Sequence, residues 1–126
     1  MYRLLPAIAA FSAGLAILAG AFGAHGLKES VSVESLSAWK TGAHYHLIHS
    51  VALFFSAKLL KEAPSFREIL PLYLFLGGIL FFSGSLYALV LTQLKLFGPI
   101  TPVGGLMFAG AWLLLGWQHI PGRNQV

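Results

Sequence analysis

The chain has 126 residues, of which 57% are apolar and 10% are charged; its formal net charge is +4 and it contains no cysteine. This length fits a single domain over residues 1–126. A soluble domain usually carries about 25% charged residues, so the low charged fraction indicates that the lipid bilayer is the main partner of this chain. The basic residues are scattered, which argues against nucleic-acid binding, and the lack of cysteine excludes disulfides and iron–sulfur clusters.

Four stretches are long and apolar enough to cross a membrane, which takes about 20 residues. They cover residues 4–24, 41–60, 69–94 and 101–118, and none has an Asp or Glu in its interior. The first also resembles a secretory signal peptide, but a signal core has only about 7–15 apolar residues, so we expect this stretch to be retained as a span. Together they predict an all-α fold, a four-transmembrane-helix bundle.

The segment 27–42, LKESVSVESLSAWKTG, is the longest polar part of the chain. Ser32 is a suitable N-cap, Glu34 lies in the first turn that would follow, and apolar residues recur at helical spacing. These apolar residues are Val33, Leu36, Trp39 and Ala43. We predict a short interfacial helix between spans one and two, with a bend at Gly42.

The other loops are short. In the loop 61–68 we expect Pro64 to end one helix and Ser65 to cap the next. Before span four, Thr101 and Pro102 fit the N-cap and the first helical position.

The distribution of Lys and Arg predicts the orientation, because cytoplasmic loops carry an excess of both. The side that would hold the termini and the loop 61–68 has five of them: Arg3, Lys58, Lys61, Arg67 and Arg123. The other side has three: Lys28, Lys40 and Lys95. Five against three favours both termini in the cytoplasm.

Small residues give three of the spans a face on which another helix can pack closely, as membrane helices require. They are Ala16, Gly20 and Ala24 in span one, Gly77, Gly84 and Ala88 in span three, and Gly105, Ala109 and Gly116 in span four. Four helices joined by short loops need these faces for one another, so we expect them to pack within one subunit rather than between copies.

Polar residues gather on one side of the predicted bundle, near the non-cytoplasmic face. They are His25, Tyr45, His49, Ser83, Ser85, Tyr87 and Thr101. At 1.5 Å of rise per residue, His49 and Tyr87 both lie roughly 10 Å inside their spans, so a contact between them is expected. Because a polar group in hydrocarbon needs a partner, we predict one hydrogen-bonded network.

Four motifs, in this order, resemble a known family: GAFGAHGL (20–27), WKTGAHYHLIH (39–49), ILFFSGSLY (79–87) and ITPVGGLMFAGAW (100–112). The chain is similar over nearly its whole length to the small membrane proteins known as domain of unknown function 423, which include bacterial inner-membrane proteins and the vertebrate transmembrane protein 256. The resemblance implies a four-span protein of the bacterial inner membrane without an established activity. The family pattern falls on Gly23 to His25, on Trp39, Thr41, Gly42, Tyr45 and His49, on Ser83 to Tyr87, and on Thr101 to Gly105; in relatives, the positions of His44 and His46 carry other polar residues.

Three alternatives use the same polar residues. A metal-binding or haem-binding redox accessory protein would use His46 and His49, three residues apart on one helix, with His25; these three are weak metal candidates, because the chain has no H-E-x-x-H motif. An oligomeric proton or small-solute channel would use His49, although no carboxylate lies inside a span. A hydrolase would use Ser83 or Ser85 with His49 as base, but no carboxylate is placed to orient that base.

We favour a structural, accessory or binding role over these alternatives. The predicted network satisfies its own polar groups and fixes the register of the helices, which needs no cofactor and no catalytic activity. The expected partners are lipid, other membrane proteins or a second copy of this chain.

Overall fold

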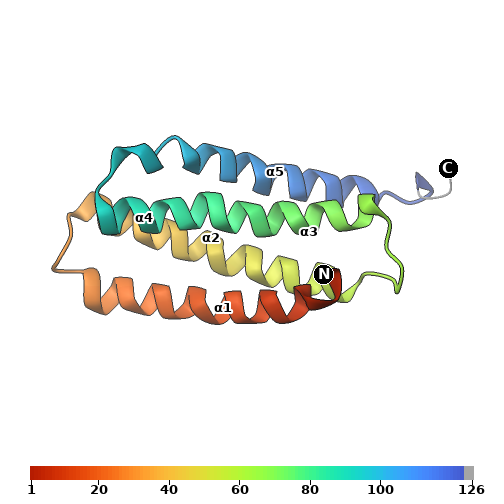
Figure 1. Ribbon diagram of the computed structural model, residues 1–126, viewed down its shortest axis with the longest axis horizontal. Coiled ribbons are helices and arrows are strands. Elements are labelled where there is room, and N and C mark those ends of the chain that lie inside the picture. Colours follow the sequence, from red (N-terminus) through yellow and green to blue (C-terminus); the bar gives the residue numbers. More distant parts are fainter. Residues whose placement is uncertain (124–126) are drawn as a thin grey trace.

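The computed structural model describes residues 1–123, and over this part the chain forms only helices and short connections (Figure 1). The long helices are α1 (Leu5–Phe22), α2 (Val33–Lys58), α3 (Phe66–Gly78), α4 (Gly84–Thr92) and α5 (Ile100–Gln118). Two short 3-10 helices are η1 (Tyr2–Leu4) and η4 (Lys95–Phe97), and two π-helical pieces are η2 (Gly23–Leu27) and η3 (Ile79–Ser83). Because η1 and η2 extend α1, and η3 joins α3 to α4, residues 1–123 form four rods.

The rods run antiparallel to their neighbours in sequence, and α2 lies between α1 and the rod formed by α3, η3 and α4 (Figure 1). It contacts α1 on one side, and α3, η3 and α4 on the other. Helix α5 packs on α3 and η3. The start of α1 and the end of α5 therefore lie at the same end of the molecule.

Three of the rods are long and apolar enough to cross a membrane: Tyr2–Leu27, Phe66–Thr92 and Lys95–Gln118. They contain the predicted spans 4–24 and 101–118 and most of the span 69–94. Helix α2 has 26 residues, roughly 39 Å at 1.5 Å per residue, which is also sufficient length. Helix α2 is not among the three rods of high hydropathy, because its polar side chains lower its mean hydropathy.

The predicted interfacial helix is not a separate element. Its residues form the first part of α2, which continues without a break to Lys58. The expected bend at Gly42 is absent, because this glycine is a packing position: a Cβ atom there would lie 3.3 Å from both Leu86 Cβ and Tyr87 Cε1 of α4. The predicted N-cap is confirmed, since the Ser32 hydroxyl accepts a hydrogen bond from the Ser35 amide at 3.1 Å.

Helix α5 and the third rod approach each other closely at Gly104. A Cβ atom on Gly104 would lie 2.2 Å from Phe82 N and 2.6 Å from Phe81 C. These are backbone atoms that cannot rotate away, so only glycine fits. The neighbouring Gly105, which the small-residue pattern favoured, has only the Phe82 ring at 3.6 Å, and Gly20 of α1 has nothing within 4 Å.

Two apolar clusters fill the bundle. The larger cluster extends from the middle of the bundle to the end where α1 begins. It contains Leu5, Ala9, Leu53, Ala57, Leu72, Phe75, Ile79, Phe108 and Ala111. The smaller one, at the other end, contains Leu27, Trp39 and Val90. Between and beside them, polar side chains of α2 are buried, and these define the candidate site.

Candidate functional site

His46 is the centre of a polar network that joins three helices. Its side chain is buried on α2, with Nε2 2.9 Å from the Ser12 hydroxyl of α1 and Nδ1 3.0 Å from the Tyr87 hydroxyl of α4. Ser50, one turn further along α2, has its hydroxyl 2.7 Å from the Ser12 hydroxyl and donates to the His46 carbonyl, also at 2.7 Å. Four side chains thus share one continuous set of hydrogen bonds.

The partners determine the direction of these bonds. Because a serine hydroxyl has one proton, Ser50, which donates to the His46 carbonyl, must accept from Ser12. Ser12 has then used its own proton, so it accepts from Nε2–H of His46. In the neutral ring Nδ1 has no proton and accepts from the Tyr87 hydroxyl.

His49 belongs to a second group of side chains, on another side of α2. The indole N–H of Trp112 on α5 donates to Nε2 of His49 at 3.1 Å, and Nδ1 lies 2.7 Å from the Tyr45 carbonyl. Tryptophan can only donate and a carbonyl can only accept, so His49 is neutral with its proton on Nδ1. The imidazole stacks on the Phe108 ring, with 3.6 Å between the ring centroids and 10° between the planes.

Tyr45 contributes its ring rather than its hydroxyl. The ring stacks on His49, with 5.7 Å between the centroids, and packs against Phe82 at 4.8 Å. Its side chain is 40% exposed on the outside of the bundle. Tyr45 therefore covers the outer side of the His49 group.

Ser85 and Thr101 form a third, separate contact between α4 and α5. Their hydroxyls are hydrogen-bonded to each other, and Ser85 also donates to the Phe82 carbonyl at 2.9 Å. The structure thus distributes the predicted polar residues over three places. In particular, Tyr87 contacts His46 and not His49.

Two predicted residues join none of these groups. Ser83, the last residue of η3, is completely buried, and its hydroxyl has no hydrogen-bond partner among residues 1–123. His25 lies on an exposed part of η2.

The histidines are not arranged as a metal site in the described part of the chain. Among residues 1–123, no three His, Cys, Asp or Glu side chains lie together in a way that could hold an ion. His46 and His49 direct their ring nitrogens to partners on different sides of α2, and His25 is exposed.

The sequence analysis did not predict three residues that form hydrogen bonds in the site: Ser12, Ser50 and Trp112. Ser12 had a usable signal, because it is the only residue with a polar side chain between Leu4 and Ala24. A lone hydroxyl in a membrane helix commonly bonds to a neighbouring helix. Trp112 had no comparable signal, since tryptophan is common in membrane helices as a packing or interfacial residue.

The fold and the site define a class of protein: a helical bundle in which three rods are long and apolar enough to cross a membrane, and in which the histidines of a more polar helix, α2, are bonded to neighbouring helices. The chain belongs to the family described as "Protein of unknown function (DUF423)", which matches residues 19–105. This confirms the family that the motifs indicated.

Relatives extend the match over most of the chain. A UPF0382 membrane protein of Staphylococcus aureus is 41% identical over 113 residues, which cover 90% of this chain and 92% of the relative. The UPF0382 membrane protein YwdK of Bacillus subtilis is 39% identical over 109 residues, which cover 86% and 89%. No solved structure matches the chain. The protein is therefore a membrane protein of a family without an assigned role.

Proposed function

We propose that this protein crosses the membrane four times, with α2 as the crossing helix of low hydropathy, and that it serves as a structural or accessory protein in the membrane rather than as an enzyme. One observation carries the proposal: all four ring nitrogens of His46 and His49 are hydrogen-bonded within the bundle. A polar helix can cross hydrocarbon when its polar groups are satisfied internally.

The position of α2 supports this crossing. Its neighbours include all three apolar rods, since α1, α3 and α4 contact it and Trp112 of α5 reaches His49. His46 is close to the middle of the helix, 13 residues after Val33 and 12 before Lys58. The polar groups thus lie at a depth where exposure to lipid would cost most.

The His46 network also supports a structural role over proton conduction. A conduction path must continue to both membrane surfaces, whereas this chain of bonds begins at Tyr87 and ends on the carbonyl of His46 itself. A closed network of this kind holds α1, α2 and α4 in one register. The Ser12 contact is the part that reaches α1.

For location and orientation, we propose the bacterial cytoplasmic membrane with both termini in the cytoplasm. The relatives are named membrane proteins, and they come from Staphylococcus and Bacillus species. Five of the eight Lys and Arg residues are expected on the side of the termini, in agreement with the excess of positive charge in cytoplasmic loops.

The absence of cysteine allows a direct topology experiment. Single cysteines replace Ser30 between α1 and α2, Ala63 between α2 and α3, and Leu96 between α4 and α5, and intact cells are treated with a membrane-impermeant maleimide. Ser30→Cys and Leu96→Cys should be labelled from outside, and Ala63→Cys only after permeabilisation. Labelling of Ser30→Cys and Ala63→Cys from the same side would show that α2 does not cross.

An accessory role predicts that the protein has a partner in its membrane. The protein, extracted with its surrounding lipid and without detergent exchange, should give particles whose mass exceeds that of one chain plus lipid. Particles that contain a single chain and lipid only would contradict the accessory role and leave the topology result unchanged.

A further inference from the structure

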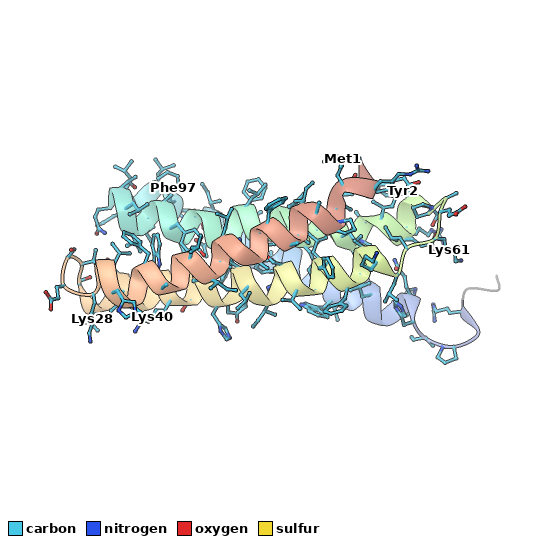
Figure 2. All side chains as sticks on the ribbon, turned by 90° about the horizontal axis from the view of Figure 1, so that it is seen from below. Met1, Tyr2, Lys28, Lys40, Lys61 and Phe97 are labelled. Carbon is cyan, nitrogen blue, oxygen red and sulfur yellow. The ribbon has the colours of Figure 1, made fainter. Side chains whose placement is uncertain are left out.

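A cleft of about 460 Å³ lies at the end of the bundle where α1 begins and α2 ends. Three of the residues that line it are cationic: Arg3, Lys58 and Lys61. Figure 2 shows Tyr2 and Lys61 at this end, far from Lys28 and Lys40 at the opposite end. The walls are held together by the Tyr2 hydroxyl, which donates to the Glu62 carbonyl at 2.7 Å.

Two of the three cationic groups of the cleft, Arg3 and Lys58, have no ion-pair partner among residues 1–123. The third, Lys61, forms an ion pair with Glu68, at 3.6 Å, while 80% of the Lys61 side chain is exposed. Glu62 is the single acidic residue of the lining. The lining residues alone carry three positive charges and one negative charge, a net charge of +2, and the Glu68 carboxylate outside the lining lowers this to +1.

The remaining walls are apolar. Pro6 of α1, Ala57 of α2 and Leu60 after α2 line the cleft beside the cations. The neighbours of Arg3 and Lys58 in the chain, Leu4 and Leu59, are 59% and 76% exposed. A cationic cleft thus adjoins apolar side chains that face outward, at the end of two membrane helices.

We propose that this cleft binds the headgroup of an anionic phospholipid. Its phosphate would lie among Arg3, Lys58 and Lys61, and its acyl chains would run along the outward apolar surface of α1 and α2. Basic pockets at the ends of membrane helices recognise such headgroups, because each Lys or Arg attracts the negative lipid and the apolar wall accepts the glycerol and the first methylenes. A free phosphate ion matches the cations but leaves the apolar walls unused.

The binding experiment uses the full chain in a neutral detergent, with native mass spectrometry as the readout. The probes are dioctanoyl phosphatidylglycerol, dioctanoyl phosphatidylcholine, glycerol phosphate and inorganic phosphate. Phosphatidylglycerol should occupy one site and bind about tenfold or more tightly than phosphatidylcholine. Glycerol phosphate and inorganic phosphate should not displace it at comparable concentrations, since they lack the acyl chains.

Charge variants test whether this cleft is the site. Arg3→Gln, Lys58→Gln and Lys61→Gln together should abolish the preference for phosphatidylglycerol, and Arg3→Gln alone should weaken binding about fivefold. The matched control removes three charges from the other end, with Lys28→Gln, Lys40→Gln and Lys95→Gln, and should keep the preference. Arg3→Lys, Lys58→Arg and Lys61→Arg together should also keep it, because all three charges remain.

Three results would overturn the proposal: an equal loss in the control triple variant, equal affinity for the two lipids, or displacement of the lipid by inorganic phosphate, which would mean that the cleft binds free phosphate. Circular dichroism of each variant verifies the fold, and Arg3→Gln, at an exposed position, provides the test if the triple variant fails to fold. The topology experiment has a different readout, so either idea can fail without the other.

Discussion

Trp112 donates its indole N–H to Nε2 of His49 across 3.1 Å, and this bond connects α5 to α2. The same contact fixes the tautomer of His49, because Nδ1 must donate to the Tyr45 carbonyl. Loss of this hydrogen bond should therefore lower the stability of the bundle.

Replacement of Trp112 by Phe retains an aromatic ring but leaves Nε2 of His49 without a donor. An unpaired buried acceptor costs about 1–3 kcal/mol, so we expect a loss of about 1–2 kcal/mol in the free energy of unfolding. Unfolding in a mixed detergent titration, followed by circular dichroism, measures it. Trp117→Phe makes the same chemical change on the same helix. The two side chains are similarly exposed, 47% and 53%, but of the two it is Trp112 that donates to a buried histidine, so Trp117→Phe should change stability by less than about 0.5 kcal/mol. Equal effects of the two variants would argue against the bond.

The His46 network makes a prediction about coupling. Ser12→Ala removes the acceptor of Nε2–H, and Tyr87→Phe removes the donor to Nδ1. Each change alone should cost about 0.5–1.5 kcal/mol, as hydrogen bonds between membrane helices do. Because both bonds use one imidazole, the double variant should lose less than the sum, by about 0.5 kcal/mol or more. Strict additivity in the same detergent titration would contradict a shared network; Ser37→Ala, at an exposed position of α2, is the control.

The spans and caps could be predicted because they depend on local sequence. Uncharged runs of spanning length predicted the three apolar rods that the structure contains. Ser65 was expected to cap a helix, and it forms a capping box with Glu68, in which the Ser65 amide donates to the Glu68 carboxylate at 2.8 Å. Such features need no knowledge of which helices are neighbours.

The partners of the histidines could not be predicted, because they depend on how each helix is rotated and where it begins. The expected contact between Tyr87 and His49 was based on a span that starts at residue 41, whereas α2 starts at Val33 and runs straight through Gly42. His46 and His49 are three residues apart, or about 60° around the helix, and this rotation directs them to different neighbours. The depth of a residue in the membrane does not distinguish His46 from His49, because the two differ mainly in their direction around the helix.

Glycine substitutions on α5 should show the same dependence on position. The Cβ atom of an Ala at position 104 would overlap the backbone of Phe81 and Phe82, so α5 must move away from η3 and stability should fall by about 1–3 kcal/mol. A Cβ atom on Gly116 of the same helix would have no neighbour within 4 Å, so Gly116→Ala should be neutral or slightly stabilising. Thermal unfolding in detergent compares the two, and similar melting temperatures would contradict the close approach.

Ser83 provides the last prediction, which separates a structural from a catalytic or ligand-binding role for this residue. Its hydroxyl is completely buried and has no partner among residues 1–123, so it contributes a desolvated polar group without a compensating bond. Ser83→Ala should therefore leave the free energy of unfolding unchanged or raise it by up to about 1 kcal/mol. Ser85→Ala is the matched control, because Ser85 bonds to Thr101 and to the Phe82 carbonyl, and its loss should cost about 1 kcal/mol. A clear destabilisation by Ser83→Ala would mean that a bound water or ligand satisfies the hydroxyl, and would direct attention to η3 as a binding position.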